Sequence, residues 1–271
     1  MLAELLFLLG VAALVAVAVF KIGWVSRSGL VGLGFVLVVS TAAFGLGGLL
    51  YAFAVLAASS FVTRFRYEQK VTIGAEEPSK GARDIWRILG GAGAAGVISV
   101  LWLVGPLEGN SLLPIAFVAS IAVTSADTWA SELGALSPGR PRLILSPRIE
   151  VSAGTSGGIS AFGEVAALAG SSFAAVVVIL TGILGMDYVT KLAIVVLAGI
   201  LAEHVDSILG ASLQGVFFCR RCQVRTERRK HSCGNEAELV RGLAFLSNER
   251  VNFVSTIVGA LIAVLLGLVL I

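Results

Sequence analysis

Charged side chains are scarce in this 271-residue chain. Asp, Glu, Lys and Arg make up only 14% of it, whereas 57% of its residues are hydrophobic, and the mean hydropathy is +0.95. So little charge argues against a soluble domain, whose surface needs polar groups. The composition indicates an integral membrane protein.

Several other features are missing, and each absence excludes a class of protein. The first apolar run has no basic start and no A-x-A-like cleavage site, so we expect it to be retained rather than removed as a signal peptide. No glycine-rich stretch ends in GK[ST], which excludes a Walker A loop. There is no basic domain and no aromatic stacking platform, so nucleic-acid binding is not indicated.

Long apolar runs predict about seven membrane-spanning helices, because a hydrocarbon core of about 30 Å needs about 20 helical residues. The expected spans are Leu2–Phe20, Leu30–Phe61, Ile85–Val104, Leu112–Ala126, Gly158–Leu184, Leu192–Leu213 and Val251–Ile271. The second is too long for one upright span and carries Gly45, Gly47 and Gly48 in its middle, which predicts a broken or re-entrant helix. The expected fold is all-α: one polytopic domain over residues 1–271, with a basic Cys/His loop at 214–250 before the last span.

The distribution of Lys and Arg predicts the orientation in the cell membrane. Three loops hold nearly all of them: Arg64 to Arg83, Arg140 to Arg148, and Arg220 to Arg250. Short loops rich in Lys and Arg stay cytoplasmic, so we expect these three loops on the cytoplasmic side. Seven spans would place the N-terminus in the cytoplasm and the C-terminus outside, whereas an eighth span would move the N-terminus outside.

Carboxylates interrupt two of the apolar runs toward this same side. SADTWASELG (125–134) contains Asp127 and Glu132, and EHVDSILGASLQ (203–214) contains Glu203 and Asp206. One acid near an interface is explained by helix capping or ion pairing, but two groups at similar depth predict a shared Mg²⁺ site, with Asp127 and Asp206 as the first choices. Glu132 and Glu203 are further candidate metal ligands.

Helical spacing separates the roles within the first acidic motif. Ser131 shares a helix face with Asp127, so it is a candidate for phosphate binding. Glu132 is rotated about 140° from Asp127. It therefore binds the same ion only if the helix breaks, and otherwise it pairs with Thr128, orients a loop, binds a second metal or is solvated.

A glycine-rich turn, VSAGTSGGISAFGE (151–164), leads into an apolar helix. Free backbone N–H groups at a helix start bind phosphate well. Close helix packing explains paired glycines equally well. Arg140, Arg142 and Arg148 precede the turn and suit phosphate recognition, while Glu164 is either a further ligand or an interfacial acid.

The three cysteines lie in one segment and, with a histidine, form a C-x2-C-x8-H-x-C set: Cys219, Cys222, His231 and Cys233. A turn with two thiolates and a returning segment with two further ligands suits tetrahedral Zn²⁺. The expected cytoplasmic position argues against a disulfide. The two remaining interpretations are a structural zinc site and unligated thiols.

Seven motifs together carry a family resemblance: SSFVTRF, SADTWASELG, PRLI, GTSGGIS, DSILGASLQ, CGN and NERVNF, in this order. From about Trp24 to Gly259 the chain resembles the integral-membrane family that includes transmembrane protein 19 and plant chloroplast phytyl-phosphate kinase. The resemblance implies that an isoprenoid monophosphate is phosphorylated to the diphosphate by a nucleoside triphosphate. A more distant similarity to polyprenol kinases implies CTP. The chain departs from the family pattern at Arg87 and Gly91, where members have Gln and Asn, and at Ser152-Ala153, where they have Pro-Pro.

Residues and resemblance together predict phosphoryl transfer at the membrane surface. Asp127 and Asp206 would hold Mg²⁺, Gly154, Thr155, Gly157 and Gly158 would cradle phosphates, and Arg64 and Arg148 would neutralise transition-state charge. Two other functions fit the same residues. A CTP-dependent cytidylyltransferase would act on a lipid phosphate at the α-phosphorus, and a cation-coupled transporter would use the carboxylates as ion sites.

Overall fold

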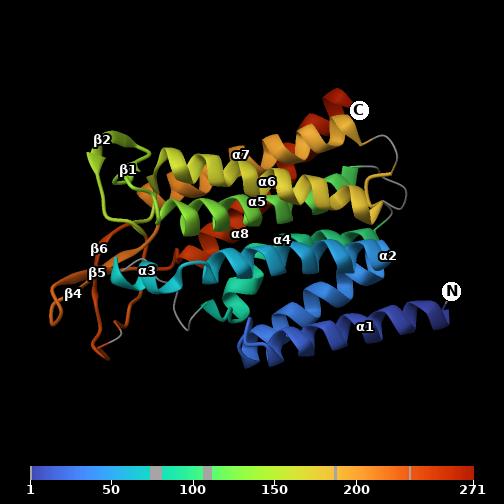
Figure 1. The fold of residues 1–271 in the computed structure, drawn as a ribbon, viewed down its shortest axis with the longest axis horizontal. Helices are drawn as coiled ribbons and strands as arrows, with labels where there is room; N and C mark the ends of the chain where they lie inside the picture. Colours follow the sequence, from blue (N-terminus) through green and yellow to red (C-terminus); the bar gives the residue numbers. More distant parts are fainter. Residues whose placement is uncertain (1, 74–80, 106–111, 186–187, 232) are drawn as a thin grey trace.

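The computed structural model describes residues 2–73, 81–105, 112–185, 188–231 and 233–271 (Figure 1). This part of the chain holds seven helices that are long and apolar enough to cross a membrane, which confirms the predicted helical membrane class. They are α1 (Leu2–Lys21), α2 (Arg27–Arg64), α4 (Ile85–Val104), α5 (Leu112–Gly134), α6 (Ala161–Thr181), α7 (Val189–Ser212) and α8 (Asn248–Leu270); a short helix, α3 (Tyr67–Thr72), follows α2.

Two of the predicted boundaries were wrong. Helix α5 continues beyond Ala126 to Gly134, so Asp127 and Glu132 lie on one continuous helix, as the predicted spacing between Asp127 and Ser131 requires. Helix α6 begins at Ala161 and not at Gly158, because the Ser160 hydroxyl caps it by accepting a hydrogen bond from Gly163 N at 3.1 Å. Gly158 lies in a strand instead.

Helix α2 is broken in its middle, as its length and glycines predict. Phe44 and Gly45 leave the helical conformation, and Gly45 has φ +60° and ψ −149°, a region that is essentially accessible only to glycine. The chain reverses there: a Cβ on Gly48 would lie 2.9 Å from the carbonyl carbon of Ser40, whereas residues eight apart in a straight helix are separated by about 12 Å. The halves, residues 27–43 and 46–64, form an antiparallel hairpin.

The hairpin decides how often the chain traverses the bundle. Each half is about 26–28 Å long, close to the ~30 Å hydrocarbon thickness, so the seven helices make eight passes. Both termini accordingly lie at one end of the bundle, and α3 and the strands lie at the other (Figure 1). This is the eight-span alternative. The assignment of the α3 end to the cytoplasm stays a prediction.

Helix α5 is the centre of the bundle and packs against α2, α4, α6, α7 and α8. Its residues Ile115, Phe117, Val118 and Ala119 are completely buried. Small residues let the neighbours approach closely, as is usual between membrane helices: a Cβ on Gly170 of α6 would lie 2.6 Å from Ser125 O of α5. This close packing fixes the position of the polar end of α5, where Asp127 lies.

Two small antiparallel sheets stand at the α3 end. The first consists of β1 (Arg142–Leu143), β2 (Ser146–Glu150) and β3 (Gly158–Ile159) in the order β2-β1-β3. The second consists of β4 (Val216–Cys219), β5 (Val224–Thr226) and β6 (Glu238–Arg241) in the order β5-β4-β6. The connections between membrane helices thus form a structured layer over one end of the bundle.

Candidate active site

A polar cavity of about 300 Å³ lies at this end of the bundle, between α4, α5, α7, α8 and the loop before α6. Its size falls within the range of small-molecule sites. Seven carboxylates line it: Asp127, Glu132, Glu164, Glu203, Asp206, Glu227 and Glu249. Only two cationic side chains in the described part of the chain line it, Arg83 and Arg87. Such an acidic lining favours cations and disfavours a bare polyphosphate.

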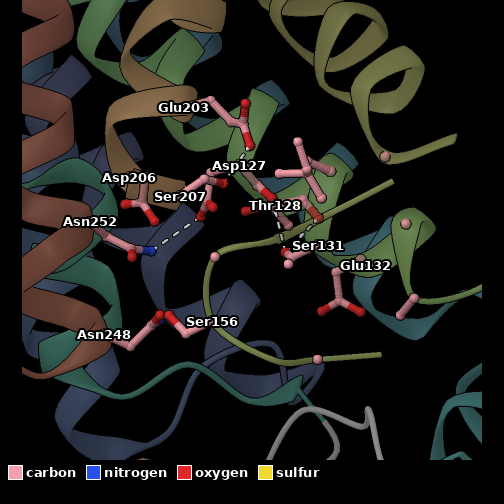
Figure 2. A pocket seen from close by; sticks show the side chains of 18 of the residues that line it. Asp127, Thr128, Ser131, Glu132, Ser156, Glu203, Asp206, Ser207, Asn248 and Asn252 are labelled. Atoms are coloured by element: carbon pink, nitrogen blue, oxygen red, sulfur yellow. Dashed lines mark hydrogen bonds between the residues drawn. The ribbon is translucent and has the colours of Figure 1, made fainter. Parts of the chain in front are cut away.

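Two of the acids converge on an asparagine, as Figure 2 shows. Asp127 comes from α5, Asp206 from α7 and Asn252 from α8; Asn252 Nδ2 donates to Asp127 Oδ2 at 3.2 Å. Asp206 Oδ2 and Asn252 Oδ1 are buried without a hydrogen-bond partner in the described residues. Buried oxygen atoms of this kind require an explanation, and carboxylate and amide oxygens are the ligands that Mg²⁺ takes. The donor set therefore fits a divalent cation.

A histidine that the sequence analysis passed over lies between two further acids. His204 Nδ1 donates to Ile200 O at 2.9 Å and lies 3.1 Å from Glu203 Oε2, while Nε2 lies 3.2 Å from Glu164 Oε2. One ligand atom from each of Glu164, Glu203 and His204 lies within 4.8 Å of the others, an arrangement that could hold a metal ion.

Glu132 lines the same cavity but has a different partner. Its Oε2 lies 2.5 Å from Lys70 Nζ, and the two side chains are 5% and 0% exposed. Lys70 also donates to Val62 O and Thr63 O at 3.0 Å, at the C-terminal end of α2. In Figure 2, Glu132 lies apart from Asp127 and Asp206. The charge of Glu132 is therefore matched by an ammonium, and this contact joins α5 to α3.

The glycine-rich turn forms one wall of the cavity. Gly154, Thr155, Gly157 and Gly158 all line it, as does Ser131 on α5. Gly157 has φ +76°, and a Cβ there would lie 2.7 Å from Ala211 N on α7. The loop thus touches the DSILGASLQ helix so closely that only glycine fits at position 157.

The two arginines on the wall were not predicted to lie there. Arg83 was assigned only to a basic loop, and Arg87 was recognised only as a departure from the family pattern, like Gly91, which also lines the cavity. Asp84 brings both arginines to the site, because its carboxylate caps α4 by accepting from Arg87 N at 3.0 Å. Two of the departures from the family pattern, Arg87 and Gly91, therefore lie on the cavity wall, whereas Ser152 and Ala153 do not.

The two predicted arginines lie elsewhere. Arg64 donates to Gly23 O at 2.7 Å and to Ser60 O at 3.3 Å, and its guanidinium lies over the Trp24 ring. It therefore ties α2 to the α1–α2 connection. Arg148 is exposed on β2. Neither residue is on the cavity wall.

A smaller apolar cavity adjoins the polar one. Arg83, Arg87, Gly91 and Thr124 line both. The remaining walls of the smaller cavity come from α2, α4 and α5 and are mainly aliphatic: Leu33, Val36, Leu37, Ala52, Val55, Leu56, Ser59, Ile88, Ala92 and Ile121. Two guanidinium groups thus mark the boundary between an acidic, polar space and an apolar one.

The four predicted zinc ligands come together outside the bundle. One ligand atom each from Cys219, Cys222, His231 and Cys233 lies within 4.8 Å of the others, and the three cysteines are not disulfide-bonded. A hydrogen bond with His231 lowers the pKa of the Cys233 thiol to about 6, whereas one with Cys233 raises the pKa of Cys222 to about 11.

Fold and site define a helical integral membrane protein with an acidic cavity at one end. Residues 10–260 match the model of the family described as Integral membrane protein DUF92, and the chain belongs to this family. The resemblance carried by the seven motifs is thereby confirmed.

Three relatives from different organisms each match most of the chain. Protein PGR of Arabidopsis thaliana is 32% identical over 234 residues, 79% of either chain. The uncharacterized membrane protein MJ0933 of Methanocaldococcus jannaschii is 29% identical over 80% of this chain and 74% of the relative. The uncharacterized membrane protein sll0875 of Synechocystis sp. is 27% identical over 84% and 76%, respectively. No solved structure matches.

Proposed function

We propose that the protein is a membrane-embedded prenyl-phosphate kinase that transfers the γ-phosphate of a nucleoside triphosphate, preferably CTP, to an isoprenoid monophosphate. The observation that carries the proposal is the junction of the two cavities, where Arg83 and Arg87 separate an acidic chamber from an apolar one. An isoprenoid phosphate has a charged head on an apolar chain, so its two parts match the two cavities. The preference for CTP rests on the resemblance to polyprenol kinases.

The metal would be held by Asp127, Asp206 and Asn252, whose oxygen atoms include two that are buried without a partner. Mg²⁺ bound there would neutralise phosphate charge. The need for it follows from electrostatics. Seven carboxylates repel a free triphosphate, so the nucleotide would enter as its magnesium complex.

The phosphates would lie against the turn at 154–158. Gly154 and Gly157 have positive φ angles, which occur in the backbone concavities that bind anions. The amides of Thr155 and Gly158 donate within the loop, to Ser152 O and Thr155 O. The start of α6 adds the positive end of a helix dipole. Thr155 and Ser131 lie on the same wall, although the Ser131 hydroxyl donates to Asp127 O at 2.9 Å within α5.

The lipid phosphate would bind at Arg83 and Arg87, since guanidinium groups recognise phosphate in a bidentate manner. The first carbons of the isoprenoid chain would occupy the aliphatic cavity between α2, α4 and α5. An oxygen of the monophosphate would attack the γ-phosphorus, a new P–O bond would form, and the β–γ P–O bond would break to release the nucleoside diphosphate. A phosphate nucleophile needs little activation, so catalysis would consist of positioning and charge neutralisation.

The test combines product analysis with matched carboxylate variants. Detergent-solubilised protein is incubated with geranylgeranyl or phytyl phosphate, Mg²⁺ and each nucleoside triphosphate, and the products are identified by mass spectrometry. Asp127→Asn and Asp206→Asn should abolish formation of the prenyl diphosphate. Glu150→Gln, which alters an exposed acid on β2 outside the cavity, should leave it unchanged.

Two results would overturn the proposal. A CDP-lipid with pyrophosphate would place the reaction at the α-phosphorus and identify a cytidylyltransferase. No product with any pair, together with uptake of cations or substrates into proteoliposomes, would identify a transporter.

A further inference from the structure

The segment between α7 and α8, residues 214–247, forms an arm that folds back over the end of the bundle. Strands β4 and β5 pair as a hairpin whose tip is CRRCQ: Cys219 pairs with Val224, and Gln223 N donates to Cys219 O at 2.8 Å. A second reversal follows at 229–237, where Ala237 N donates to Arg229 O at 2.7 Å and His231 N donates to Asn235 O at 2.9 Å. The arm therefore presents two tight turns.

Each turn supplies two of the four candidate zinc ligands. The first carries Cys219 and Cys222, and the second carries His231 and Cys233, with all four ligand atoms within 4.8 Å of one another. Cys219 Sγ and Cys233 Sγ lie 3.6 Å apart. Two sulfur atoms bound tetrahedrally at about 2.3 Å from Zn²⁺ would be separated by about 3.8 Å. The thiols are already at nearly the separation that a shared zinc ion imposes.

The arm has little else to hold it together. Of its described residues, Phe217 and Cys219 are the only hydrophobic ones that are buried. Its strands are three or four residues long. A segment with so small a core does not fold independently, and a structural metal is the usual means of stabilising one.

The arm is also attached to the candidate active site. Leu243 N donates to Leu213 O at the end of α7 at 2.9 Å, and Arg241 donates to Gly210 O on α7 at 3.1 Å. Glu227, just after β5, lines the polar cavity. The conformation of the arm therefore determines whether this wall of the cavity is present.

We propose that Cys219, Cys222, His231 and Cys233 bind one structural Zn²⁺ ion, which fixes the arm in the fold that carries Glu227 to the cavity. The closed four-ligand set leaves no position for a substrate, so the ion is structural and not catalytic. The proposal stands on the arm alone and does not depend on the prenyl-phosphate kinase activity.

The experiment measures metal and protection in the full chain, purified in detergent without chelators or metal-affinity resin. Elemental analysis should give about one zinc per chain, and Cys222→Ser or His231→Ala should reduce this to about a tenth or less. The matched control is Arg221→Ser, an exposed position between two ligands, which should keep the metal. Cobalt substitution should produce the intense d–d bands of a tetrahedral thiolate site.

Digestion with trypsin tests the second half of the proposal, which is the structural role of the metal. Trypsin cleaves after Arg and Lys, and the arm contains six such sites close together: Arg220, Arg221, Arg225, Arg228, Arg229 and Lys230. Removing zinc with a thiol-directed mercurial and a chelator should speed cleavage in the arm at least about tenfold while the membrane helices stay intact. Less than about 0.2 zinc per chain in the wild type, without zinc or cobalt uptake on titration, would overturn metal binding. Zinc binding with unchanged trypsin cleavage would overturn the structural role. Both measurements are made on the wild type, so they hold even if a variant does not accumulate, and neither uses a substrate.

Discussion

Replacing Glu132 by Gln should leave the Lys70 ammonium buried without a counter-charge. Lys70 is 0% exposed and has three acceptors: Glu132 Oε2 at 2.5 Å and the carbonyls of Val62 and Thr63 at 3.0 Å. After the substitution only dipoles remain around a full charge. Removing one partner of a buried ion pair costs about 3–5 kcal/mol. For a chain of this size that corresponds to a fall in Tm of about 6–20 °C.

The assay is thermal unfolding in detergent, followed by circular dichroism. Glu68→Gln is the control, because Glu68 is an exposed acid on the same short helix as Lys70, and its Tm should stay within about 2 °C of the wild type. In Lys70→Met/Glu132→Leu both charges are replaced by apolar groups, so the double variant should be more stable than either single variant.

The same variant separates a structural role from metal binding. If Glu132 only balances Lys70, the Mg²⁺ concentration for half-maximal activity should not change in the surviving enzyme. A Glu132→Gln variant with wild-type Tm and a raised Mg²⁺ requirement would refute the reasoning and return Glu132 to the metal site.

Further predictions concern glycines, one arginine and the topology. Gly157→Ala should lower turnover more than about tenfold and destabilise the protein, because φ is +76° and the added Cβ meets Ala211. The control is Gly139→Ala, because a Cβ on Gly139 meets no atom within 4 Å. Equal turnover and stability of the two variants would contradict the loop geometry. Gly45→Ala should cost about 1–3 kcal/mol in a denaturation assay, whereas Gly34→Ala, in a helix with open space, should be neutral or slightly stabilising. Arg87→Gln should raise KM for the lipid phosphate about 10- to 100-fold, as expected for losing a charge-assisted contact of about 1.5–3 kcal/mol, and an unchanged KM would remove Arg87 from the lipid site. Reporter fusions at the two termini should lie on the same side of the membrane, and opposite sides would contradict the α2 hairpin.

Much of the molecule follows from local sequence. Apolar runs define the helices because a lipid environment requires every backbone group to be paired within its own segment. Helical periodicity places Asp127 and Ser131 on one face of α5. The spacing of Cys219, Cys222, His231 and Cys233 brings four ligands to two turns, since each pair is separated by only one or two residues.

Tertiary structure decided which of these residues meet. Asn252 contacts Asp127 across 125 residues of sequence, and no local sequence pattern indicates a contact between residues so far apart in the chain. Helical spacing turned Glu132 away from Asp127 but did not identify its partner; its side of α5 faces the end of α2, where Lys70 arrives from α3. Likewise, Arg64 and Arg148 are basic residues that the sequence does not distinguish from the two arginines of the site. Only Arg83 and Arg87, around the start of α4, line both cavities. Composition and spacing determine which chemical groups a membrane helix presents and at what depth. The packing of helices around α5 determines the direction in which each group points, and therefore which of them share one site.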